Sequence, residues 1–269
     1  VYAPLLASIE ANKGAYTSAW MIIFAVIAAI MVLIGIYHIK VLPSSQVPST
    51  TKKTTSEIER ELMAVIADFF TKKHIFYYIC FIILYRLAEG FIMKIAPLFL
   101  RASRDVGGLG LSLTEIGTLN GVFGSAAFVL GSLLAGIYVS KFGLKKTLFT
   151  LCCIFNLPFA AYTFLAVVQP TNVYLIGTCI TMEYFGYGFG FVGLTLFMMQ
   201  QIAPGKHQMS HYAFASGIMN LGVMLPGMVS GYFSDLLGYR NFFIYVLIAT
   251  IPAFLITYFI PFTYDDSKK

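Results

Sequence analysis

The chain has 269 residues, of which 58% are hydrophobic and only 11% are charged, and its mean hydropathy is +0.80. A soluble domain of average composition carries about 25% charged residues, so this composition excludes a water-soluble fold. The net charge of +6 does not indicate nucleic-acid binding, because the basic residues form short clusters between apolar segments. We therefore expect an all-α membrane protein that has no nucleic-acid partner.

Seven apolar segments are each long enough to cross a hydrocarbon core of about 30 Å, which takes roughly 20 helical residues. In chain order they lie at residues 18–38, 74–99, 114–138, 147–168, 171–199, 211–233 and 242–261. The first has no initiator Met or charged segment before it, so we expect a transmembrane helix and not a signal peptide. Turn-forming residues between the later segments predict helical hairpins. They are Gly107, Gly108, Gly110, Gly143, Gln169, Pro170, Pro204 and Gly205.

Lysine and arginine are distributed unequally between the two sides of the predicted membrane. Twelve of the 18 lie on the side of the first long connection, four lie on the other side, and Arg86 and Lys94 fall within the second span. Because cytoplasmic loops carry the excess of positive charge, the N-terminus is expected outside and the C-terminus in the cytoplasm.

The longest connection, residues 39–73, starts with proline and serine and becomes amphipathic at Ser56. Ser56 and Glu59 fit a capping box, and apolar residues then repeat at helical spacing. This pattern predicts a helix from Ser56 to Phe70 that lies on the cytoplasmic membrane face. The expected domains are residues 1–40, which contain one transmembrane helix, the linker 41–73, and a six-helix bundle over 74–269.

Charged residues inside the predicted spans are candidates for binding a substrate or protons, because a charge there costs at least about 2.5 kcal/mol. Arg86 and Glu89 are three residues apart and can pair on one helix face, although a static ion pair is an equal alternative to a functional one. Glu183 lies at a similar depth in the fifth span, so it can meet Glu89 and Arg86 at one cavity. Lys94 is near enough to the end of its span to reach the interface. Asn220 completes the set of candidates.

The segment EYFGYGFGF around Glu183 contains Gly186, Gly188 and Gly190. No strand precedes this GxGxG pattern, so it does not indicate a nucleotide site. We interpret it as a device for close helix packing or as a flexible stretch, and we interpret Gly227 and Gly231 as a packing GxxxG.

Other chemistry-bearing residues carry no recognisable site. His207 and His211, at the start of the sixth span, are expected to be solvated. The four cysteines have neither CxxC spacing nor histidine partners, so we interpret them as small apolar core residues. There is no HExxH, GxSxG or metal-ligand cluster. We expect no metal site, no cofactor and no enzymatic activity.

The joint between the third and fourth spans reads GIYVSKFGLKK, which resembles the cytoplasmic loop signature of the major facilitator superfamily. Gly136, Lys141, Gly143, Lys145 and Lys146 fit that signature. Ser140 stands where the family has an acid, so the role of that acid does not carry over to this chain.

Within that superfamily the chain is similar to the AmpG-type anhydromuropeptide permeases from about Ile75 onward. Three segments carry the resemblance: YRLAEGFIMKIAPLFL, MEYFGYGFGF, and the stretch from Ala213 through GVMLPGMVSGYFSDLLGYRNFF. The resemblance implies that the first span is helix six of the family and that the other six spans form its C-terminal half. Helices one to five would then be missing, through truncation of the chain or through a split gene.

The resemblance also implies a function. The family works by alternating access at the interface between two six-helix bundles. We expect proton-driven import of cell-wall products, GlcNAc-anhydroMurNAc with or without its peptide, through a bacterial inner membrane. Protonation of Glu183 or Glu89 would release its pairing with Arg86. The expected partners are this small solute, protons, the lipid bilayer and the missing N-terminal half.

Two other functions stay open. One is a facilitator-superfamily carrier of a different solute, such as an acyl-CoA or a drug. The other is a seven-helix membrane sensor, which the span count favours. The facilitator loop and the absence of lysine from residues 242–261, where a retinal Schiff base would need one, stand against the sensor.

Overall fold

The computed structural model of the chain describes residues 16–41 and 54–264, and the regular elements of these residues are all helices. The chain divides into two units, Val1–Met63 and Ala64–Lys269, and each is described by itself. The first unit contains α2 (Tyr16–Val41) and the first residues of α3 (Thr55–Thr71). α2 has 26 residues, so it covers the first predicted span and extends it at both ends.

The helix predicted from Ser56 to Phe70 is confirmed as α3, but its N-terminal cap is not the predicted one. The Thr54 carbonyl oxygen accepts a hydrogen bond from the Ile58 amide at 3.1 Å, and the Thr54 amide donates to Glu57 Oε2 at 2.8 Å. The capping pair is therefore Thr54 and Glu57, and the prediction of Ser56 and Glu59 was wrong by two residues. The error arose because Thr54, Thr55 and Ser56 all have hydroxyl groups that suit a cap.

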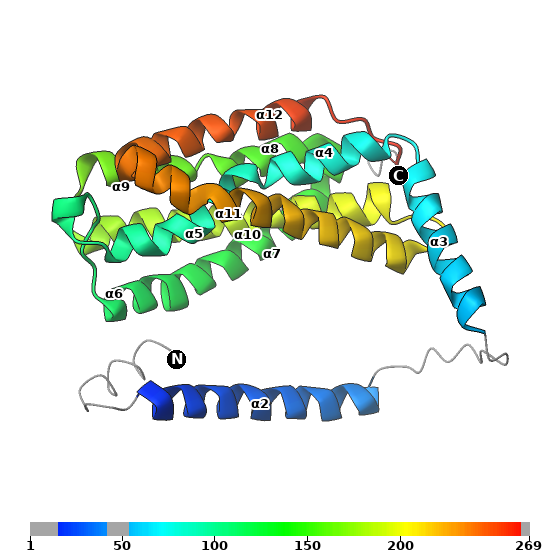
Figure 1. Cartoon of the computed structure of the whole chain (residues 1–269), viewed down its shortest axis with the longest axis horizontal. Helices are drawn as coiled ribbons and strands as arrows, with labels where there is room; N and C mark the ends of the chain where they lie inside the picture. Colours follow the sequence, from blue (N-terminus) through cyan, green and yellow to red (C-terminus); the bar gives the residue numbers. More distant parts are fainter. Residues whose placement is uncertain (1–15, 42–53, 265–269) are drawn as a thin grey trace. The chain divides into compact units, whose positions relative to one another are not determined.

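The second unit is a bundle of helices that run side by side (Figure 1). Its α-helices are α4 (Ile75–Tyr85), α5 (Leu87–Arg101), α6 (Leu113–Thr118), α7 (Ser125–Phe142), α8 (Leu144–Asn156), α9 (Phe159–Val168), α10 (Val173–Phe197), α11 (Gln208–Ala249) and α12 (Ile251–Tyr258). A short 3-10 helix, η1 (Arg104–Val106), lies between α5 and α6. The π-helical segments η2 (Leu119–Gly124) and η3 (Met198–Ile202) continue α6 and α10.

Among the described residues, five helical segments are long and apolar enough to cross a membrane. They are Thr17–Val41, Ile75–Arg101, Leu113–Phe142, Leu144–Val168 and Gln208–Tyr258. The last has 51 residues and covers both the sixth and the seventh predicted spans. Gly238 (φ 68°, ψ 160°) is not helical and divides this segment into two helices, one for each predicted span. The fifth predicted span is helical as α10. Its glycine, threonine and tyrosine residues and Glu183 lower its mean hydropathy, so it is not among the five apolar segments.

Helix α10 is central to the bundle, since it packs against α7, α8 and α9, while α11 packs against α5, α4 and α9. Aromatic side chains fill much of the interior, and Tyr85 shows how they are held. Its ring is completely buried, and its hydroxyl donates a hydrogen bond to the Gly190 carbonyl oxygen at 2.9 Å. This bond fixes α4 against α10.

The glycines of α10 permit this close packing. A Cβ on Gly188 would overlap the Phe128 carbonyl oxygen of α7, and a Cβ on Gly190 would stand 2.8 Å from the Leu151 carbonyl oxygen of α8. The packing interpretation of the GxGxG segment is therefore confirmed. For the GxxxG pair it holds only at Gly227, where a Cβ would lie 3.4 Å from the Gly90 carbonyl oxygen of α5. At Gly231 it was wrong, because no atom of the described residues lies within 4 Å of a Cβ there.

The predicted turns are confirmed by the backbone, since Gly107 (φ 83°) and Gly143 (φ 80°) adopt conformations that favour glycine. The interpretation of the cysteines was only partly correct. Cys152 is buried in the core, but Cys80 is exposed.

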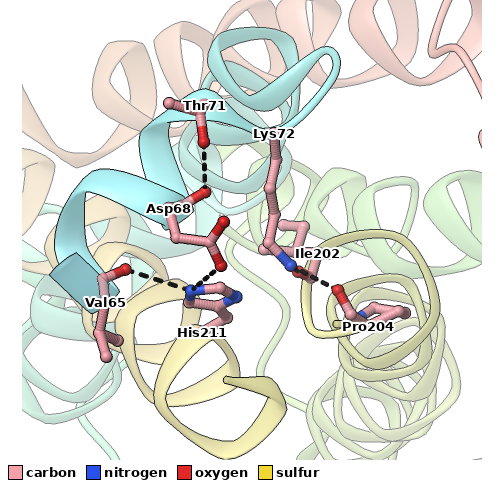
Figure 2. Close-up of polar contacts among 7 residues, drawn as sticks. All are labelled: Val65, Asp68, Thr71, Lys72, Ile202, Pro204 and His211. Atoms are coloured by element: carbon pink, nitrogen blue, oxygen red, sulfur yellow. Dashed lines mark hydrogen bonds and ion pairs between the residues drawn. The ribbon is translucent and has the colours of Figure 1, made fainter. Parts of the chain in front are cut away.

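Lys72 joins the end of α3 to the segment after α10 (Figure 2). Its Nζ atom donates hydrogen bonds to the carbonyl oxygens of Ile202 and Pro204, at 2.6 Å each. Burial lowers the pKa of Lys72, and the nearby charge of Asp68 acts in the opposite direction. The two carbonyls otherwise lie at the end of a helix, where such groups lack partners.

His211 at the start of α11 lies under α3, and its side chain is 0% exposed. Its Nε2 atom is 3.2 Å from the Val65 carbonyl oxygen and 3.6 Å from Asp68 Oδ2, as Figure 2 shows. The Phe69 ring lies against it, with the ring centroids 5.7 Å apart. The prediction of a solvated His211 was therefore wrong, because the position of α3 over α11 is a long-range contact that local sequence does not reveal.

Candidate functional site

The second predicted span is two helices, because Arg86 (φ −104°, ψ 5°) interrupts it between α4 and α5. At this break the Arg86 guanidinium donates from Nε to Glu89 Oε2 at 2.6 Å and from Nη2 to Glu89 Oε1 at 2.5 Å. The two side chains are only 6% and 7% exposed. The predicted pairing of Arg86 with Glu89 is confirmed.

The same guanidinium lies over the Phe191 ring of α10, with its Cζ atom 5.4 Å from the ring centroid. A cation over an aromatic face is attracted by the electron density of the ring. Arg86 is thus held by a carboxylate of α5 and by an aromatic side chain of α10. Its charge is balanced within the membrane-spanning part of the chain.

A cavity of about 110 Å³ lies beside Glu89, between α5, η2, α9 and α10. Its lining consists of Glu89, Ile92, Met93, Ala96, Pro97, Leu100, Asn120, Tyr162, Glu183, Tyr184 and Tyr187. The two carboxylates that sequence analysis placed at a similar depth therefore meet at one cavity. Arg86 does not line it and is connected to it through Glu89.

Glu183 differs from Glu89 in its surroundings. In the part of the chain that the structure describes, no hydrogen bond or ion pair satisfies its carboxylate, and the charged group that acts on it is Glu89. Tyr162, Tyr184 and Tyr187 line the same cavity. An acidic group without a partner at membrane depth is costly, and such groups mark substrate or ion pathways.

Asn120 is a further polar residue of the cavity that sequence analysis missed. Its Oδ1 atom is buried and has no hydrogen-bond partner among the described residues. An unsatisfied buried acceptor costs about 1–3 kcal/mol, so it needs an explanation in folding or in function. The available signal was an amide side chain inside a predicted membrane span.

Two candidates lie outside the cavity. Lys94 and Asn220 are both exposed, and neither contributes to the lining. The aliphatic part of Lys94 lies near Gly227 of α11. The structure therefore brings together Glu89 and Glu183, with Arg86 attached, and does not bring Lys94 and Asn220 to them.

The loop signature forms a separate hollow of about 670 Å³ between α7, α8 and α10. Gly143 ends α7 and precedes α8, while Gly136, Lys141 and Lys146 line the hollow. Ser140 donates from its hydroxyl to the Ile137 carbonyl oxygen of its own helix. Lys145 also belongs to this loop and is exposed. Gly136 makes no close helix contact in the described part of the chain, because a Cβ there would meet no atom within 4 Å.

Within residues 16–41 and 54–264, no group of three or more His, Cys, Asp or Glu residues is arranged to hold a metal ion. The chemistry available at the cavity is therefore that of two carboxylates, an amide and phenol hydroxyls. These groups can exchange protons and can form hydrogen bonds with a polar solute.

Comparison with known proteins points to membrane transport. The chain is 23% identical over 209 residues to the anhydromuropeptide permease of Escherichia coli (strain K12), a match that covers 78% of this chain and 41% of that protein. It is 25% identical over 257 residues to a protein of Rickettsia bellii (strain RML369-C) whose name describes an AmpG 1 transporter. This match covers 91% of this chain and 60% of that protein.

The chain thus spans 41% and 60% of the length of these two relatives. The sequence model of the Major Facilitator Superfamily matches residues 2–203 and, in a second match, residues 108–269. Together with the membrane-length helices, these matches indicate a multi-pass membrane protein from a family of transporters. The chain belongs to the major facilitator superfamily.

Proposed function

We propose that this chain forms the C-terminal bundle of a proton-coupled importer of muropeptides, GlcNAc-anhydroMurNAc with or without its peptide. The observation that carries the proposal is the cavity between membrane helices that both Glu89 and Glu183 line. Glu89 is paired with Arg86, whereas Glu183 has no partner among the described residues. The similarity to the anhydromuropeptide permease of Escherichia coli supports the class of solute.

Proton coupling follows from the difference between the two carboxylates. Glu89 is satisfied by two hydrogen bonds from Arg86, so its charge is balanced. Glu183 has no such partner among the described residues, and binding a proton removes the cost of its charge in a membrane interior. In this mechanism Glu183 takes up a proton with the solute and releases it on the other side. A protonated Glu183 also relieves the repulsion on Glu89, which biases the bundle between its two facing states.

The proposed setting is a bacterial inner membrane with the C-terminus in the cytoplasm, which the distribution of lysine and arginine supports. The proposed partner is an N-terminal bundle of the same transporter. Alternating access requires two bundles that move around a shared site. The chain covers 41% of the Escherichia coli relative, a share that is compatible with one bundle of such a transporter.

The test is uptake of labelled GlcNAc-anhydroMurNAc by cells that lack their own permease and express the complete gene product. Accumulation that an uncoupler abolishes would support both the solute and the proton gradient as the driving force. Accumulation that an uncoupler leaves unchanged would discard proton coupling. If no label accumulates although the protein is inserted in the membrane, the muropeptide assignment is wrong, and competition with acyl-CoA and drug molecules would then separate the other carriers.

A further inference from the structure

The cavity lining offers three kinds of surface at once. Ile92, Ala96 and Leu100 of α5 present apolar surface, and tyrosines of α9 and α10, which carry hydroxyl groups, also line the cavity. Asn120 Oδ1 and the Glu183 carboxylate are acceptors without a donor in the described part of the chain. A ligand that fits all three must combine an apolar group, a hydrogen-bond acceptor and an N–H or O–H donor.

The close packing of η2 against α10 determines the position of Asn120. Gly124 lies four residues after Asn120, and a Cβ at Gly124 would stand 2.9 Å from Cγ of Tyr184. On the other helix, a Cβ at Gly177 would stand 2.7 Å from Cδ2 of Leu119. The absence of side chains at both glycines allows η2 to approach α10 closely. Asn120 is therefore held at the cavity by backbone packing, and π-helical segments of this kind are frequent at functional sites.

The size of the cavity limits what it can accept. Pockets that enclose drug-sized ligands measure about 300–1,000 Å³, whereas this cavity measures about 110 Å³. It can hold several water molecules or one small substituent, but it cannot enclose a disaccharide. The cavity is thus suited to one polar group that projects from a larger solute.

We propose that this cavity is a subsite for the acetamido group of an N-acetylated amino sugar. The amide N–H donates to Asn120 Oδ1, the carbonyl oxygen accepts from a tyrosine hydroxyl, and the methyl group lies against α5. Glu183 stays available for the proton. The subsite rests on the proposed function, since it names the part of the muropeptide that the C-terminal bundle recognises.

The test is competition against uptake of labelled GlcNAc-anhydroMurNAc by the complete gene product. N-acetylglucosamine should inhibit at concentrations about tenfold lower than glucose or glucosamine do, the factor that one hydrogen bond to a buried acceptor supplies. The variant Asn120→Leu has a similar volume but no acceptor, so it should lose this preference and show a higher KM with little change in maximal rate. Asn120→Asp keeps an oxygen acceptor and should retain most of the preference.

Val122 is the matched control, because it belongs to the same segment η2 but is 45% exposed and does not line the cavity. In the Val122→Thr variant, the three sugars should inhibit uptake at the same concentrations as they do in the wild type. If Asn120→Leu does not reach the membrane, Asn120→Ser removes the amide with a smaller side chain. Equal inhibition of the wild type by the three sugars, stronger inhibition by glucosamine, or an unchanged preference in inserted Asn120 variants would overturn the subsite while muropeptide uptake stands. Absence of uptake by the wild type would instead overturn the proposed function, and the subsite with it.

Discussion

The guanidinium of Arg86 binds both carboxylate oxygens of Glu89 at the point where a membrane helix is interrupted. The two residues are three positions apart in the sequence, and their opposite charges form a bidentate pair. Both side chains are almost completely buried. The pair balances its own charge, so it does not need a solute or an ion. It also leaves Glu183 as the carboxylate at the cavity without a hydrogen-bonding partner among the described residues.

The first prediction concerns the stability of this pair. Arg86→Met leaves the buried Glu89 without its cation, and removal of one partner from a buried pair costs about 3–5 kcal/mol. We expect a lower free energy of unfolding in detergent, measured by chemical denaturation. The double variant Arg86→Met, Glu89→Leu removes both charges and should recover most of the loss. A double variant as unstable as Arg86→Met would show that the pair is not what stabilises this region.

The second prediction separates Glu183 from the structural framework. Glu183→Gln keeps the size of the side chain but cannot exchange a proton, so gradient-driven accumulation should be lost. Exchange of labelled for unlabelled solute should continue, because it needs no net proton movement. Uptake and counterflow assays on the same cells measure both quantities. Accumulation equal to that of the wild type would remove Glu183 from the coupling mechanism.

The third prediction tests the close approach of α7 and α10. A methyl group at Gly188 would overlap the Phe128 carbonyl oxygen, so Gly188→Ala should destabilise the bundle by about 1–3 kcal/mol through overpacking. Gly217 of α11 is the matched control, because nothing in residues 16–41 and 54–264 lies within 4 Å of a Cβ there. Gly217→Ala should leave stability unchanged or raise it by up to about 1 kcal/mol through helix propensity. Thermal unfolding measures the stability of both variants, and equal stabilities of Gly188→Ala and Gly217→Ala would contradict the packing explanation.

The fourth prediction concerns the attachment of α3. Lys72→Met removes the donor for the carbonyl oxygens of Ile202 and Pro204, at a cost of about 1.5 kcal/mol for hydrogen bonds from a charged group. The amides of residues 65–71 should then exchange with deuterium about tenfold faster. Lys73→Met is the control, because Lys73 is exposed and takes no part in these bonds. Unchanged exchange in Lys72→Met would show that the apolar contacts of Phe69 suffice to hold the helix.

Much of the fold could be predicted from local sequence. Long apolar segments predict membrane helices because backbone groups must be satisfied internally in lipid. Gly107 and Gly143 were predicted to form turns from their residue type and their place between apolar segments. The structure confirms this with positive φ angles, which favour glycine. The interruption at Arg86 was not predicted, since the segment has no glycine or proline at that position to indicate a break in the helix.

The candidate site was predictable only in part. Arg86, Glu89 and Glu183 stood out because charges are rare in membrane spans. Asn120 was missed and Asn220 was chosen instead, because only the structure shows which of the two amides is buried at the cavity without a partner among the described residues. His211 was judged solvated for the opposite reason, since the residues of α3 that cover it are far away in sequence.

By itself the sequence determined the class of the protein, most of its helices and turns, and the charged residues that lie inside its apolar segments. These properties depend on residue type and on spacing along one helix, which are local. Only the tertiary structure decided that Glu89 and Glu183 share one cavity, that Asn120 joins them, and that Lys94 and Asn220 do not. Those relationships depend on which helix faces pack together, and the packing is set by contacts such as Gly188 against Phe128 between segments distant in the chain.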